Sequence, residues 1–162
     1  MSKNFKQYRI TKYNPIHRVN GIYTKDEWTS MYDVGKSYDK KIFKFEDYLV
    51  VERSYLKVIE KVLQELNIKR VVIKQGENIY SKLNNSVLRS QEEVLLVARG
   101  CLREEFWCKL ESKNFFVHFG YDYYMYIGAD IEEKHMFEIA RENGLFSELI
   151  QQSPYLHFTD GT

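Results

Sequence analysis

The spacing of apolar side chains along the chain predicts three helices. Apolar residues recur at helical intervals over residues 45–66 with no glycine or proline between them, so this segment is predicted to form a long core helix. Ser90 precedes a second apolar stripe and Glu93 follows three residues later, which is the pattern of a capped helix N-terminus. Asp130 precedes a third stripe in the same way, and Asn143-Gly144 is a typical stop signal.

Alternation of apolar and polar residues predicts the strands. Residues 5–13 alternate and are ended by Asn14-Pro15, and residues 69–75 form a short β-branched run. Residues 106–111 and the aromatic run 115–127 are predicted to be the two long strands of an antiparallel hairpin. In the second of these strands one face would carry Phe115, Val117, Phe119, Tyr121, Tyr123, Met125 and Ile127, and the other face Phe116, His118, Gly120, Asp122, Tyr124 and Tyr126.

Turn residues and loops separate these elements. Asn20-Gly21 predicts a tight hairpin turn, because both residues tolerate positive φ angles. Residues 25–41 are polar but contain several aromatic residues, so we expect an ordered loop that these rings hold in place. The stretch 144–158 is apolar enough to dock on the body, and Ser153-Pro154 would end any short helix in it.

Composition agrees with one compact globule. A chain of 162 residues with 44% hydrophobic residues can build a core without disulfides or metals. We therefore predict a single domain over residues 1–162 of the α+β (mixed α/β) class, in which a mixed sheet with an antiparallel hairpin near residues 106–127 is packed by three helices.

Targeting and redox signals favour a cytoplasmic protein. No apolar run approaches the roughly 20 residues needed to cross a bilayer, and the first ten residues contain no signal-peptide core, so no membrane partner is expected. Cys101 and Cys108 fit a reducing compartment, and their spacing matches no familiar zinc site.

Charge is balanced overall but unevenly distributed. The formal net charge is +1, whereas residues 1–44 carry ten Lys/Arg and four Asp/Glu and residues 82–162 carry eight Lys/Arg and thirteen Asp/Glu. The basic N-terminal run alternates cations with aromatic rings, as single-strand nucleic-acid binding proteins do. These residues are Lys3, Lys6, Arg9, Lys12 and Arg18 with Phe5, Tyr8 and Tyr13.

Two patterns that resemble phosphate or metal sites are each incomplete. Gly35-Lys36-Ser37 is similar to the end of a phosphate-binding loop, but Ser30 stands where that loop needs glycine. Glu132, His135 and Glu138 share a helix face at metal-ligand spacing, but a di-iron bundle needs two such helices. We expect no metal, no cofactor and no catalytic residue set.

The tyrosine-rich face of the run 115–127 is predicted to be either core, covered by another element, or an exposed contact surface, and in the second case it is the best candidate for binding. His118 and Asp122 lie four residues apart on one predicted strand, about 13 Å along it, which is too far for a direct hydrogen bond without a bulge. Aromatic side chains are enriched at interface hot spots. The candidate partner-binding residues are therefore His118, Asp122, Tyr124, Tyr126, Trp28 and Tyr32.

Several segments also carry a family resemblance. They are YRITKYNP at 8–15, NGIYTKDEWTS at 20–30, VERSYLKVIE at 51–60, VHFGYDYYMYIG at 117–128 and SPY at 153–155. In these segments the chain resembles small uncharacterised cytoplasmic proteins of Gram-positive bacteria, some of which are similar to immunity proteins of polymorphic toxin systems. Immunity proteins against nucleases are often acidic mimics of nucleic acid, and only the C-terminal part of this chain has an acidic excess.

The expected function is that of a non-enzymatic protein-binding module. The resemblance implies an immunity protein that binds and neutralises a cognate toxin. Two alternatives stay open: a nucleic-acid-binding protein that uses the basic aromatic N-terminus, and a small-molecule enzyme built around His118 and Asp122.

Overall fold

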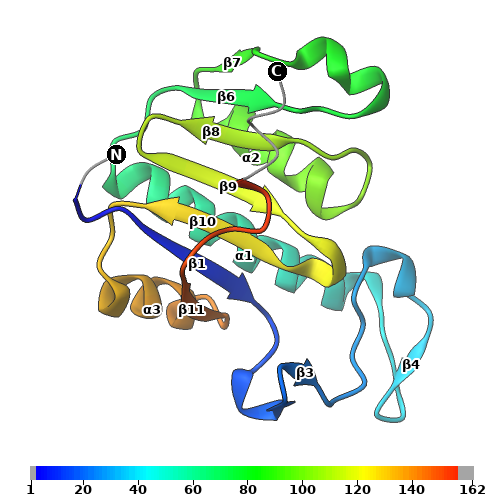
Figure 1. Cartoon of the computed structure of the whole chain (residues 1–162). Coiled ribbons are helices and arrows are strands. Elements are labelled where there is room, and N and C mark those ends of the chain that lie inside the picture. The colour runs from blue at the N-terminus through cyan, green and yellow to red at the C-terminus, as the bar shows by residue number, and fades with distance from the viewer. Residues whose placement is uncertain (1–2, 157–162) are drawn as a thin grey trace.

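The computed structural model describes residues 3–156, apart from the side chains of residues 78–80. A seven-stranded sheet forms its centre, and three helices cover one face of that sheet (Figure 1). The strands of this sheet are β1 (Lys6–Thr11), β6 (Val71–Lys74), β7 (Val87–Leu88), β8 (Lys109–Ser112), β9 (Phe115–Phe119), β10 (Met125–Ala129) and β11 (Phe146–Ile150). Their order is β11-β1-β10-β9-β8-β6-β7, and every neighbouring pair is antiparallel. The α+β class is confirmed, whereas the sheet, predicted to be mixed, is antiparallel at every pairing within the described residues.

The three predicted helices are present as α1 (Phe45–Glu65), α2 (Gln91–Leu102) and α3 (Glu133–Glu142). Ser90 caps α2, because its hydroxyl accepts the backbone N–H of Glu93 at 3.1 Å. Gly144 follows α3 with a φ of 71°, a conformation that glycine adopts without steric cost. None of the helices within residues 3–156 combines the length and apolarity that crossing a membrane requires.

The core lies between the sheet and the helices. One row of side chains runs across five neighbouring strands and faces the helices, and all of its members are buried: Tyr8, Ile127, Val117, Leu110 and Ile73. Tyr55, Ile59 and Val62 of α1 pack against it. Of the face predicted to carry Phe115, Val117, Phe119, Tyr121, Tyr123, Met125 and Ile127, every residue is buried except Tyr121, which is 85% exposed.

The prediction of one long strand over residues 115–127 is wrong. The segment is itself a hairpin, in which β9 and β10 pair through a short 3-10 turn, η4 (Tyr121–Tyr123). Asp122 and Tyr123 have φ angles of 57° and 66°, which an extended strand does not allow. The alternation of faces resumes after the turn, since Phe119 pairs with Met125.

The C-terminal stretch forms a strand, β11 (Phe146–Ile150), and no short helix precedes Ser153-Pro154 within it. β11 pairs with β1 and so covers what would otherwise be an open sheet edge. Residues 151–156, which we name the C-terminal strap, then turn across the outer face of the sheet, opposite the helices (Figure 1). His157 and Phe158, the end of the predicted docking segment, lie outside the described residues.

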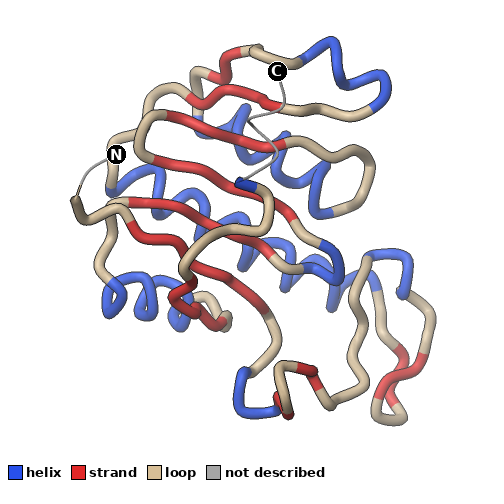
Figure 2. The backbone as a smooth tube through the Cα atoms, viewed as in Figure 1, coloured by secondary structure: helices blue, strands red, loops and turns tan. Residues whose placement is uncertain are grey.

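Residues 14–44 form a second feature beyond the end of the sheet, which we name the hairpin extension (Figure 2). It contains two small hairpins, β2 (Arg18–Val19) with β3 (Ile22–Tyr23) and β4 (Ser37–Tyr38) with β5 (Lys41–Ile42). The predicted turn at Asn20-Gly21 is confirmed by φ angles of 51° and 78°. The stretch predicted as a loop over residues 25–41 holds most of the second hairpin.

Candidate functional site

His118 lies on the outer face of the sheet and is fully buried beneath the C-terminal strap. Its Nδ1 is 2.9 Å from Ser153 Oγ and its Nε2 is 2.9 Å from Glu111 Oε1. Phe116 stacks on the imidazole with a centroid distance of 4.2 Å. Both ring nitrogens are therefore occupied, and neither is bound to Asp122.

The charges of this cluster favour a neutral imidazole. Burial lowers the pKa of His118, and the hydrogen bond from His118 lowers the pKa of Glu111. The consistent assignment is that Nε2–H donates to an ionised Glu111 while Nδ1 accepts the hydroxyl of Ser153. The backbone N–H of Tyr155 donates in turn to Ser153 Oγ at 3.3 Å.

A serine, a histidine and a carboxylate in one chain of hydrogen bonds are also the components of hydrolytic triads. Here Ser153 is 1% exposed, and its backbone N–H donates to Gln7 Oε1 at 2.7 Å. Ser153 and His118 do not line the cavity described below. The arrangement holds the strap on the sheet, and Lys109 adds a hydrogen bond to the carbonyl oxygen of Tyr155.

The other candidate residues of the tyrosine-rich face differ in exposure. Asp122 is exposed, and its carbonyl oxygen accepts the hydroxyl of Tyr13 at 2.6 Å. Tyr124 is half-buried against Tyr13, with a centroid distance of 5.3 Å. Tyr126 is half-buried against Tyr155 at 5.9 Å, and burial raises its pKa. The N-terminal segment and the strap thus cover part of the predicted face.

Trp28 and Tyr32, the two candidates in the hairpin extension, have opposite roles. Trp28 is half-buried and stacks on Phe43 at 4.6 Å, which fixes the base of the extension to the core. Lys12, only 7% exposed at its side chain, places its ammonium 4.2 Å from the Trp28 ring. Tyr32 is 67% exposed and is free to contact a partner.

Exposed apolar side chains are concentrated on the hairpin extension. Of the thirteen large hydrophobic side chains exposed within the described part of the chain, six lie in residues 14–44: Ile16, Val19, Ile22, Tyr32, Val34 and Ile42. Val19 and Ile22 are directly paired across β2 and β3. Exposed apolar side chains that are concentrated on one protruding segment are typical of an interaction site.

The basic N-terminal run does not present a free basic face. Arg9 and Arg18 both bind Glu148, while Lys6 pairs with Glu132 and Lys12 with Glu27. Two of its aromatic rings, Tyr8 and Tyr13, are buried. Stacking on bases and contact with phosphates would both require these side chains to leave their present partners.

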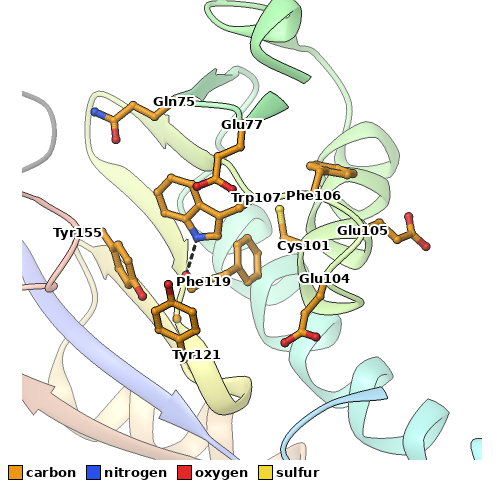
Figure 3. A pocket seen from close by; sticks show the side chains of 11 residues that line it. Gln75, Glu77, Cys101, Glu104, Glu105, Phe106, Trp107, Phe119, Tyr121 and Tyr155 are labelled. Carbon is orange, nitrogen blue, oxygen red and sulfur yellow. Dashed lines mark hydrogen bonds between the residues drawn. The ribbon is translucent and has the colours of Figure 1, made fainter. Parts of the chain in front are cut away.

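A cavity of about 680 Å³ opens beside the strap, where α2 ends and β9 turns (Figure 3). Four separate segments of the chain supply its walls. Its lining residues are Gln75, Glu77, Cys101, Glu104, Glu105, Phe106, Trp107, Phe119, Gly120, Tyr121 and Tyr155.

Local backbone geometry at the end of α2 shapes the cavity. Glu104 has a φ of 58°, and the N–H of Glu105 donates to the carbonyl of Gly100, so the chain turns sharply after the helix. A Cβ atom at Gly100 would lie 2.4 Å from Phe106, so only glycine lets this ring pack on α2. The indole N–H of Trp107 donates to the carbonyl of Phe119 at 2.8 Å and fixes the ring in the wall.

The candidate metal patterns do not come together. Within residues 3–156 no group of three or more His, Cys, Asp or Glu residues is placed to hold a metal ion. Cys101 and Cys108 are both buried with their sulfur atoms 3.6 Å apart. On α3, His135 binds Glu65 of α1 and so joins the two helices.

Comparison with known proteins gives no match among family models, curated proteins or solved structures.

The sequence pattern pointed to Trp28 and Tyr32 in the extension but did not predict the cavity. Glu77, Trp107, Tyr121 and Tyr155 lie in four different segments, and no local pattern links them.

Proposed function

We propose that the protein is a non-enzymatic binding module of the immunity type, which binds a toxin domain through the hairpin extension and blocks its activity. The observation that carries the proposal is the concentration of exposed apolar side chains on residues 14–44. The resemblance to immunity proteins suggests that the partner is a toxin domain. We expect such an inhibitor to act in the cytoplasm.

The extension is held firmly enough to serve as a recognition element. Trp28 and Phe43 stack at its base, and the backbone of Phe43 exchanges two hydrogen bonds with Gly35 and Lys36 at 2.8 Å. A surface that is already ordered loses less conformational entropy on binding than a flexible loop does. The exposed side chains at the hairpin tips can therefore anchor a partner.

The charge around these anchors suggests the chemistry of the partner surface. Asp39 and Lys40 form the exposed turn of the second hairpin, and the exposed Lys41 and Ile42 follow it, so the tip carries two lysines against one aspartate. An apolar depression with carboxylates at its rim would complement this tip. We expect the toxin domain to present such a surface.

Affinity purification of the tagged protein from its native cells, with a stoichiometry measurement, tests the proposal. We expect one protein at a one-to-one ratio, whose own activity falls when the complex forms. Ile22→Ser and Ile42→Ser should each weaken the complex at least tenfold, on the scale of interface hot spots. Leu96→Ser, which changes an exposed apolar residue on α2, is the matched control and should leave binding unchanged.

Two results would count against the proposal. A stoichiometric partner with unchanged activity would remove the inhibitor role, and binding that survives both isoleucine substitutions would remove the extension as the interface. Recovery of nucleic acid alone, with affinity that falls steeply with salt, would favour the nucleic-acid alternative.

A further inference from the structure

The cavity combines aromatic walls with negative charge. Five of its eleven lining residues are aromatic, three are glutamates, and none of the described residues that line it is Lys, Arg or His. Its volume of about 680 Å³ lies in the range of small-ligand sites. Aromatic faces and carboxylates both attract cations, so the lining selects for a positively charged group.

Glu77 and Trp107 place these two attractions side by side. The backbone N–H of Glu77 donates to the carbonyl of Trp107 at 3.1 Å, and Figure 3 shows the Glu77 side chain directed along the indole. Tyr155 and Tyr121 lie on one side of the cavity, whereas Glu105 points away from it (Figure 3). The nearby cation Lys109 is buried and directed at the carbonyl of Tyr155.

The cavity is also joined to the hairpin extension. Glu104, at its rim, accepts a hydrogen bond from Ser30 Oγ at 3.0 Å. This hydrogen bond connects the rim of the cavity to the extension at Ser30. Tyr121, which also lines the cavity, is 85% exposed and so lies on its solvent side.

We propose that the cavity receives an arginine side chain of the protein partner, with its guanidinium stacked on the aromatic wall and paired with Glu77. This inference rests on the proposed function for the identity of the partner. A guanidinium fits better than an ammonium, because it is planar, stacks on aromatic rings and binds a carboxylate through two parallel hydrogen bonds. The volume leaves room for residues that flank the arginine in its chain.

The first test uses the full-length protein and short blocked peptides. The probes are Ac-Ala-Arg-Ala-NH₂, the same peptide with the neutral isostere citrulline, and free arginine amide. The protein has two tryptophans, so its NMR spectrum contains two indole N–H signals, one from Trp107 in the cavity wall and one from Trp28 in the extension. We expect saturable movement of the Trp107 signal only, with the citrulline peptide at least tenfold weaker.

Two substitutions at exposed positions locate the site with little risk to folding. Glu77→Gln removes one charge and Tyr121→Ala removes one ring, and each should weaken the arginine peptide at least fivefold. Glu142→Gln, an exposed glutamate on α3, is the matched control and should bind as the unchanged protein does. Equal unfolding midpoints in urea for the variants show that the binding loss is local.

The outcomes separate this inference from the proposed function. Absence of binding by the arginine peptide, or equal binding of the citrulline peptide, would overturn the cavity as a cation site. Arginine amide that binds as tightly as the peptide would overturn the assignment to a polypeptide. A toxin complex that is insensitive to Glu77→Gln but lost in Ile42→Ser would overturn only the proposal that the cavity receives an arginine of the partner. Peptide binding without any stoichiometric partner would overturn the toxin-inhibitor function.

Discussion

At the scale of single residues, the absence of a side chain at Gly128 allows the aromatic rings on the outer face of the sheet to pack closely. Gly128 pairs with Phe116 across β9 and β10, and a Cβ atom there would lie 2.2 Å from the Phe116 ring and 2.6 Å from that of Phe5. Because no side chain intervenes, Phe116 can lie flat against His118. A small residue here thus supports the cluster that holds the strap.

Gly128→Ala should destabilise the protein by about 1–3 kcal/mol, the usual cost of inserting a methyl group into a filled site. Urea unfolding measures the free-energy change. The double variant with Phe116→Leu should recover part of the loss, because the smaller side chain can move away. An alanine variant as stable as the unchanged protein would show that the rings shift at no cost.

At the scale of elements, an ion pair between a buried glutamate and a partly exposed arginine ties α1 to the end of α2. Glu52 on α1 is 3% exposed at its side chain and accepts two hydrogen bonds from Arg103, at 2.7 and 2.8 Å. The hydroxyl of Tyr48 also donates to Glu52 at 2.6 Å. These contacts satisfy a carboxylate that would be costly to bury alone.

Arg103→Ala should cost about 3 kcal/mol of unfolding free energy, since it leaves Glu52 buried without its cation. Arg99→Ala, at an exposed position on the same helix, should change stability by less than about 0.5 kcal/mol. Thermal or urea unfolding compares the two variants. The double variant Glu52→Leu, Arg103→Met should be more stable than Arg103→Ala, and failure of this recovery would mean that the pair contributes more than the relief of burial.

At the scale of the whole molecule, the cluster beneath the strap makes stability depend on pH. Burial lowers the pKa of His118. As the pH falls, the imidazole therefore binds a proton near pH 6.5 in the unfolded chain, but only at a lower pH in the folded protein. Stability is therefore complete above about pH 6.5 and falls as the pH drops toward the folded pKa. Glu111, whose pKa is lowered by its hydrogen bond from His118, adds a loss of the same sign below about pH 4.3.

The free energy of unfolding, measured in urea between pH 5 and 8, should fall below pH 6.5 with a slope that one proton limits to about 1.4 kcal/mol per pH unit. His118→Gln should remove that part of the slope. His135→Gln, at a half-exposed histidine on α3 that does not contact the strap, is the comparison variant. Parallel pH profiles for the unchanged protein and His118→Gln would contradict a neutral, buried His118.

The sequence by itself determined the elements whose signal is local. The helical spacing over 45–66, the cap at Ser90 and the turn at Asn20-Gly21 all correspond to observed structure, because each depends on residues within a few positions of one another. Alternation also grouped Phe115, Val117 and Phe119 on one face of β9, but it did not show which face is buried, since both faces of this strand are buried. The α+β class follows from the sum of these elements.

The tertiary structure decided the features that join distant residues. The strap contacts join Ser153 to His118 and Lys109 to Tyr155 across 35 and 46 residues, and the cavity walls come from four segments. His118, predicted to contact a partner, is therefore buried beneath the strap. The cavity is formed by residues that no sequence motif connects. Propensity acts over a few residues, whereas burial and pairing depend on which surfaces the folded sheet brings together.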